Sequence, residues 1–239
     1  MNQTILVVDD DREIVGAIKK LLEMEGYQVL TAYDGLESLE CMMDEDVHLI
    51  ILDIMMPKLN GLATLMKIRE KKNIPVLLLS AKTEESDKVL GLSMGADDYI
   101  EKPYRPAELV ARVKSSLRRY LLWSNQANPA NASAQDPKNT IKNGGLELNL
   151  DEKQIYVDGE AVKLTPTEYK ILELLMKHPG RVFSAEEIYE RVWQEQAYAP
   201  ENTVMVHVRR IREKIEINPK VPKYLKVVWG IGYKMEKYR

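Results

Sequence analysis

The chain has 239 residues, of which 45% are hydrophobic and 30% are charged, and its formal net charge is −3. This length suits one or two domains, and the single cysteine, Cys41, excludes a framework of internal disulfides and fits a reducing compartment. No apolar run approaches the roughly 18 residues of a membrane-spanning helix, so we expect a soluble, cytoplasmic protein without a membrane partner.

The charge is divided unevenly along the chain. Residues 1–122 carry 16 Lys and Arg against 21 Asp and Glu, whereas residues 140–239 carry 17 against 15. A mildly basic second half permits a nucleic-acid partner, although two ordinary solvated surfaces would explain the same difference.

The first half alternates short apolar runs with segments of helical periodicity. The runs that we predict as strands are 5–8, 28–32, 49–52, 76–79 and 98–102. The first helical segment carries Ile14, Val15, Ile18, Leu21 and Leu22 on one face, and Gly26 follows as a C-cap. Because the strands are almost wholly apolar and alternate with helices, the pattern predicts a doubly wound, five-stranded parallel sheet of the α/β class.

The composition changes after the last helical segment of this half. Residues 123–143 are rich in Asn, Ala, Ser and Pro, and we interpret them as a flexible linker between a domain at 1–122 and a domain at 144–239. In the second domain we expect short strands near 146–164, then three helices, then two strands around a Gly-x-Gly turn. The first of these helices starts with a capping box, in which Thr165 is the N-cap and Glu168 the partner.

Polar side chains follow four of the predicted strands in the first half. Asp9 and Asp10 come after the first strand, Asp53 after the third, Ser80 after the fourth and Lys102 after the fifth. Since the carboxyl ends of parallel strands share one edge of the sheet, these groups should converge, and the three carboxylates would repel one another without a cation. Oxygen ligands of this kind suit Mg²⁺, and a carboxylate beside Mg²⁺ can attack a phosphoryl group.

The motifs ILVVDDD, LIILDIMMPKLNG, LLLSAK and GADDYIEKPY resemble the receiver domain of two-component response regulators. The resemblance implies a CheY-like fold with strand order 2-1-3-4-5, and Asp53 as the residue phosphorylated by a sensor histidine kinase. It further implies that Mg²⁺ is bound by Asp10, Asp53 and the backbone carbonyl of Met55, with Asp9 acting through water. Ser80, Tyr99 and Lys102 take the switch and catalytic positions, with a cis bond before Pro103.

A basic helix marks the second half, in which Arg209, Arg210, Arg212 and Lys214 accompany apolar residues at helical spacing. Such a helix is either a core helix with a solvated face or a recognition helix in a major groove. The motifs LTPTEYKILELL, RVFSAEEIYERVW, NTVMVHVRRIREKIE and VVWGIGYKME resemble the winged helix-turn-helix effector domain of the OmpR/PhoB family, and its VanR-like branch most.

This second resemblance implies a set of residues facing double-stranded DNA, with Arg210 at a base edge. The set is Thr203, His207, Arg209, Arg210, Arg212, Lys226, Tyr233 and Lys234. Two positions depart from the family pattern, because Asn202 and Trp229 stand where many members have Arg. A neutral indole cannot use the negative potential of a narrow minor groove, so Trp229 puts the usual wing contact in doubt.

Charged residues late in the first domain match the face through which phosphorylated receivers of this family form a homodimer. They are Lys88, Asp97, Asp98, Glu101, Glu108, Arg112, Arg118 and Arg119. The expected pairs between subunits are Lys88 with Glu108 and Asp98 with Arg112. A phosphoryl group on Asp53 would draw Ser80 inward, Tyr99 would follow, and two effector domains would then occupy adjacent half-sites and engage RNA polymerase.

Other interpretations remain open at this point. Asp10 or Asp11 could cap the helix that starts near Arg12, and Lys102 could be a surface lysine. A Mg²⁺-dependent phosphatase or phosphotransferase with Asp53 as nucleophile is a second hypothesis, although Met55 stands where such hydrolases usually have a second Asp. A third is a DNA-binding protein whose first domain only dimerises and takes no phosphate.

Overall fold

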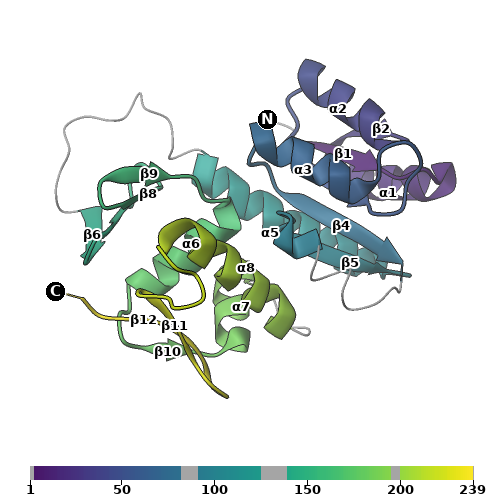
Figure 1. Cartoon of the computed structure of the whole chain (residues 1–239). Helices are drawn as coiled ribbons and strands as arrows, with labels where there is room; N and C mark the ends of the chain where they lie inside the picture. The colour runs from purple at the N-terminus through teal and green to yellow at the C-terminus, as the bar shows by residue number, and fades with distance from the viewer. Residues whose placement is uncertain (1–2, 82–90, 125–138, 195–199, 239) are drawn as a thin grey trace. The chain divides into compact units, whose positions relative to one another are not determined.

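The computed structural model describes residues 3–81, 91–124, 139–194 and 200–238 (Figure 1). Contacts within the chain divide it into two units, Met1–Tyr120 and Leu121–Arg239. Each unit has its own sheets and its own hydrophobic core. Within the described ranges, no helix is both long enough and apolar enough to cross a membrane.

The first unit contains the predicted parallel sheet, with strand order β2-β1-β3-β4-β5. Its strands are β1 (Thr4–Val8), β2 (Gln28–Ala32), β3 (Leu49–Asp53), β4 (Val76–Ala81) and β5 (Asp98–Lys102). Its helices are α1 (Arg12–Met24), α2 (Gly35–Asp44), α3 (Gly61–Lys71) and α5 (Pro106–Ser124). The order 2-1-3-4-5 confirms the expected CheY-like topology.

Both faces of this sheet are buried, which is why its strands are apolar almost throughout. One face packs against α1 and α5 through a cluster that includes Ile5, Ile51, Leu77, Ile18 and Val113. On the other face, a β-carbon added at Gly91 would lie 2.4 Å from Leu78 and 3.6 Å from Leu62 of α3, so this face is closely packed too.

Short polar residues start the helices on the carboxyl side of the sheet. Asp11 caps α1 by accepting hydrogen bonds from the backbone N–H groups of Glu13 (2.8 Å) and Ile14 (3.3 Å). Asp34 caps α2 and Asn60 caps α3 in the same way. The simpler interpretation of the acid run as a helix cap is therefore correct for Asp11, while Asp10 stays exposed beside it.

The second unit surrounds three helices with two antiparallel sheets. The four-stranded sheet has β6 (Thr140–Asn143), β7 (Leu146–Asn149), β8 (Gln154–Val157) and β9 (Glu160–Val162) in sequential order. The helices are α6 (Pro166–Met176), α7 (Ala185–Trp193) and α8 (Pro200–Ile215). The other sheet has the order β10-β12-β11, from β10 (Val182–Phe183), β11 (Leu225–Val228) and β12 (Gly232–Met235).

The predicted linker is too long at both ends. Helix α5 continues to Ser124, and Thr140–Asn143 pairs with β7 as strand β6, so those residues are regular structure. Strand β6 escaped prediction because its residues, TIKN, have little apolar character, and the strand depends on its partner for hydrogen bonds. The remainder of the proposed linker, 125–138, lies outside the described residues.

Candidate functional sites

Three carboxylates converge at the carboxyl edge of the parallel sheet. Asp9 follows β1 and Asp53 ends β3, and both are buried, Asp53 being only 4% exposed. Together with the exposed Asp10 they offer oxygen atoms that all lie within 4.8 Å of one another. This set of hard oxygen donors, open on one side, is of the kind that binds Mg²⁺.

Lys102, at the end of β5, joins two of these acids. Its Nζ donates to Asp9 Oδ2 at 2.6 Å and to Asp53 Oδ1 at 2.7 Å. Burial raises the pKa of Asp53, and Lys102 partly opposes that shift. Burial disfavours the charge on Lys102, but its bonds to Asp53 and Asp9 outweigh burial and raise its pKa. Lys102 is thus a partly buried partner of the acids and no ordinary surface lysine.

The chain behind Asp53 is tightly confined. The other carboxylate oxygen of Asp53, Oδ2, accepts the N–H of Met55 at 2.7 Å, and the N–H of Gly61 donates to the carbonyl of Ile54 at 3.0 Å. A β-carbon at Gly61 would lie 2.0 Å from the carbonyl oxygen of Asp53, so only glycine fits there. This contact holds the N-terminus of α3 against the end of β3.

Ser80 lies on β4, the strand beside β3, and Tyr99 lies on β5, the next strand along the sheet. Ser80 is buried at the end of β4, opposite Glu101 of β5, and Tyr99 is half-buried on β5, opposite Leu78. The bond between Lys102 and Pro103 is cis, as expected. The structure therefore gathers Asp9, Asp10, Asp53 and Lys102 at one edge and places Ser80 on the strand next to Asp53.

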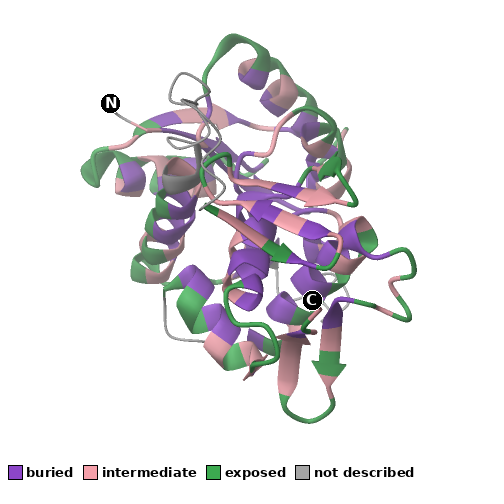
Figure 2. Cartoon of the chain, turned by 90° about the vertical axis from the view of Figure 1, so that its left-hand side faces the viewer, coloured by how far each residue is buried: buried purple, intermediate pink, exposed green. Residues whose placement is uncertain are grey.

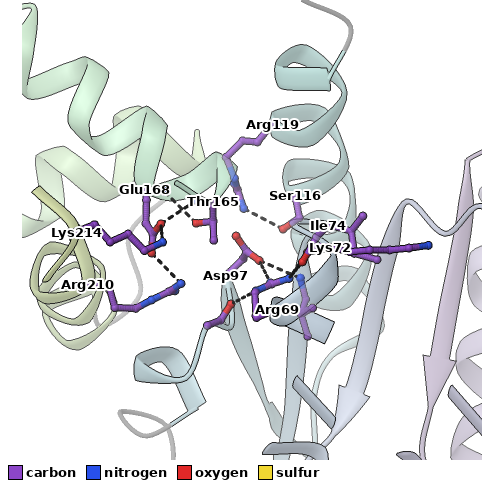
Figure 3. A network of polar contacts seen from close by, with 12 residues as sticks. Arg69, Lys72, Ile74, Asp97, Ser116, Arg119, Thr165, Glu168, Arg210 and Lys214 are labelled. Carbon is purple, nitrogen blue, oxygen red and sulfur yellow. Dashed lines mark hydrogen bonds and ion pairs between the residues drawn. The ribbon is translucent and has the colours of Figure 1, made fainter. Parts of the chain in front are cut away.

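Several residues of the expected dimer face have partners within their own chain. Asp97 is buried, and its Oδ2 accepts from Arg69 Nη2 at 2.8 Å and from the N–H of Val76 at 3.0 Å (Figure 3). Arg69 also donates to the carbonyls of Gly95 (2.8 Å) and Ile74 (2.7 Å). Asp97 therefore anchors the start of β5 inside its own unit, which sequence reasoning missed.

Arg112 also has its partners within the chain. Its Nη1 lies 2.7 Å from Asp98, and its Nη2 lies 3.1 Å from Glu108. Asp98 and Arg112 thus form an ion pair within one chain. Arg119 donates to Ser115 and Ser116, one turn earlier on α5. Lys88 lies outside the described residues.

Helix α8 presents fewer of its cations to solvent than predicted. Arg209 is exposed and pairs with Glu213 at 3.0 Å. Thr203, His207 and Arg210 are buried, contrary to the expectation that they face a ligand. The pattern misled because Val204, Val208 and Ile211 form the core face while the adjacent stripe of Thr203, His207 and Arg210 is buried as well.

Glu168 of the capping box binds two cations of α8 (Figure 3). Its Oε2 accepts from the N–H of Thr165 at 2.8 Å and from Lys214 Nζ at 2.7 Å. Arg210 Nη2 lies 2.8 Å from Oε1, as an ion pair without the alignment of a hydrogen bond. Burial alone would raise the pKa of Glu168, but Arg210 and Lys214 hold it below its usual value. The predicted capping box is confirmed, whereas its second role was missed.

The hairpin of β11 and β12 carries lysines on its strands and apolar residues at its turn. Lys226 and Lys234 are directly opposite in the pairing; Lys226 donates to the carbonyl of Pro222, and Lys234 pairs with Glu236 at 3.0 Å. Tyr233 is half-buried. The turn carries Trp229, 88% exposed, and is drawn green in Figure 2.

Comparisons with known proteins agree over both units. The family model of the response regulator receiver domain matches residues 5–114, and that of the C-terminal domain of transcriptional regulatory proteins matches residues 159–235. The regulatory protein VanR of Enterococcus faecium is 41% identical over 238 residues, covering 99% of this chain and 100% of VanR. The alkaline phosphatase synthesis transcriptional regulatory protein PhoP of Bacillus subtilis is 42% identical over 239 residues, covering 99% and 98%.

A solved structure shows the same likeness over the full length. DrrB of Thermotoga maritima, described as an OmpR/PhoB homologue, is 29% identical with a TM-score of 0.50, and the match covers 99% of this chain and 100% of DrrB.

Proposed function

This chain belongs to the OmpR/PhoB family of two-component response regulators, which are transcriptional regulators, and we propose that Asp53 is its phosphoacceptor. One observation carries the proposal. Asp53 is a buried carboxylate that shares a 4.8 Å cluster with Asp9 and Asp10, and Lys102 bridges it to Asp9. Such a costly arrangement of like charges is typical of functional sites.

A carboxylate oxygen of Asp53 attacks the phosphorus of a phosphohistidine on a sensor kinase. The P–N bond breaks, an acyl phosphate forms, and the imidazole regains a proton. Asp10, Asp53 and the carbonyl of Met55 would hold Mg²⁺, with Asp9 acting through water, and when bound the ion would neutralise the phosphoryl oxygens. Lys102 is placed to leave Asp53 and contact the new phosphoryl group.

The signal then passes to the neighbouring strands. Ser80 turns toward the phosphoryl group, Tyr99 follows, and the surface of β5 and α5 changes so that two receivers pair. For Arg112 to reach a second subunit it must first leave Asp98 of its own chain. Asp97 is excluded from our set of dimer contacts, because Arg69 and Val76 bind its carboxylate.

The second unit binds promoter DNA in the cytoplasm, and the dimer acts on RNA polymerase. Arg209 is the cation of α8 that is already exposed, and Lys226, Tyr233 and Lys234 contribute from the hairpin. Thr203, His207 and Arg210 are buried, so we do not place them among the first contacts. Our assignment therefore moves the first contact from Arg210 to Arg209.

Size-exclusion chromatography with light scattering tests the proposal. The full chain is measured with and without Mg²⁺ and a small acyl phosphate, alongside Asp53→Asn and a control, Asp46→Asn, which removes an exposed acid at the opposite edge of the sheet. We expect phosphate to be retained, and a dimer to form, only in the wild type and the control. Retention of phosphate by Asp53→Asn would refute the assignment of Asp53. Phosphorylation without dimerisation would refute the charged dimer face.

A further inference from the structure

The carboxylate at the end of α8 binds the main chain that leads into the hairpin. Glu216 is 8% exposed and directly follows α8. Its Oε2 accepts the N–H of Lys223 at 2.7 Å, and its Oε1 accepts the N–H groups of Tyr224 and Leu225, both at 2.8 Å. Three successive N–H groups therefore converge on one side chain, and charged acceptors make the strongest hydrogen bonds of this kind.

A second side chain of α8 holds the same point of the hairpin. Arg212, one turn before Glu216, donates from Nε to the carbonyl of Leu225 at 2.9 Å. Both backbone groups of Leu225, the first residue of β11, are thus bound by Arg212 of α8 and by Glu216 directly after it. We expected Arg212 to contact DNA, but in the structure its Nε donates to the hairpin backbone.

The intervening loop supplies little packing to fix the hairpin. Residues 217–222 connect α8 to the segment that Glu216 binds, and their apolar side chains point outward, with Ile217 98% and Val221 73% exposed. The end of α8 and the start of β11 are therefore joined by the polar contacts of Glu216 and Arg212 and by the burial of Leu225 in the core that also contains Ile215.

We propose that Glu216 is a positioning residue for DNA recognition, which sets the angle between the recognition helix and the wing by binding the backbone of Lys223, Tyr224 and Leu225. This inference rests on the proposed DNA-binding function. Helix and hairpin must reach different grooves at a fixed separation, so an error in that angle weakens a specific complex more than a nonspecific one. Glu216 itself touches no phosphate, because a carboxylate would repel it.

Whether DNA binding is weakened or strengthened in the variant distinguishes a positioning role of Glu216 from a simple effect of its charge. Removing a negative charge next to DNA should strengthen binding if charge alone matters. In Glu216→Gln, one carbonyl oxygen can still accept from Tyr224 and Leu225, but the new NH₂ group faces the N–H of Lys223. Glu213→Gln is the control for charge, because it removes the same charge one turn earlier, from an exposed residue that pairs with Arg209 and has no bond to the hairpin in the described structure.

The experiment measures fluorescence anisotropy of the full chain, treated with Mg²⁺ and an acyl phosphate, over a series of salt concentrations. The probes are a duplex selected by the wild type from a randomised library and a random duplex of equal length. We expect Glu213→Gln to bind both probes at least as tightly as the wild type. We expect Glu216→Gln to bind the random duplex normally but the selected duplex roughly tenfold more weakly, or about 1.4 kcal/mol, with an unchanged salt slope.

Glu216→Asp provides a second variant that keeps the charge. It shortens the side chain, so we expect the same loss on the selected duplex. Equal binding of that duplex by Glu216→Gln and Glu213→Gln would overturn the inference. Equal losses on both duplexes would also overturn it, because Glu216 would then only support the fold. A wild type that selects no duplex would refute the proposed DNA-binding function itself.

Discussion

Replacing Glu168 with Gln should destabilise the second unit by more than any ordinary change on α6. The variant keeps an acceptor for the N–H of Thr165, but it removes the charge that faces Arg210 and Lys214. Lys214 is one-third exposed and can turn to water, whereas the side chain of Arg210 is 9% exposed. Removing one partner of a buried ion pair costs about 3–5 kcal/mol, so we expect a loss in that range.

Urea unfolding of the full chain, followed by the fluorescence of the buried Trp193, measures this loss. The control is Glu173→Gln, because Glu173 on the same helix also pairs with two cations, Lys170 and Lys177. Those lysines are partly exposed and can be hydrated, so the control should lose less than about 1 kcal/mol. Equal losses in the two variants would refute the reasoning.

The pH dependence of unfolding provides a second test on the wild type and Glu168→Gln. The folded-state pKa of Glu168 is lowered from its ordinary value of 4.5. Its contribution to stability is therefore complete above pH 4.5 and is lost as the pH falls through the lower, folded-state pKa. The difference in unfolding free energy between the wild type and Glu168→Gln should narrow in that acidic window, and a constant difference would contradict the assigned pKa shift.

Three further predictions concern the acidic edge and the hairpin. Gly61→Ala should lower the unfolding free energy of the first unit by about 1–3 kcal/mol or more, because the added β-carbon meets the backbone of Asp53. Gly16→Ala should instead raise that free energy by about 0.5–1 kcal/mol, because Gly16 lies on α1 with no atom near the added β-carbon. Thermal unfolding tests both. Asp53 offers one of three carboxylate oxygens that lie within 4.8 Å of one another, so Mg²⁺ should raise the melting temperature of the wild type at neutral pH far more than that of Asp53→Asn. Trp229→Arg should tighten DNA binding and steepen its salt dependence by about 0.9, and an unchanged slope would place the tip away from DNA.

The fold of the first unit was readily predicted, because each strand is a short apolar run that is buried on both faces. The convergence of Asp9, Asp53 and Lys102 also followed from strand order alone, since parallel strands end at one edge. The capping box at Thr165 could also be predicted, because its two partners are only three residues apart in the sequence.

The failures share a physical cause, which is that a side chain's partner can be distant in sequence. Asp97 was expected on a surface, but it pairs with Arg69, 28 residues earlier in the sequence. Glu168 was expected only to cap a helix, but Lys214 lies 46 residues later. His207 was assigned to DNA because it lies on a basic helix, yet it is buried and packs against Trp193, with ring centroids 5.5 Å apart. Helical periodicity does not reveal how many sides of a helix are covered.

At residues 223–225, all of which the structure describes, Glu216 binds backbone N–H groups and no side chains, which has a consequence for protein engineering. Substituting the side chains at 223–225 leaves all three N–H groups in place, so no residue there needs to change together with Glu216. Analysis of covarying positions would therefore overlook the link. Chimeras that exchange hairpins between relatives should keep these three hydrogen bonds as long as none of the positions is proline, which has no N–H to donate, while residues 224 and 225 must still fill the hydrophobic core.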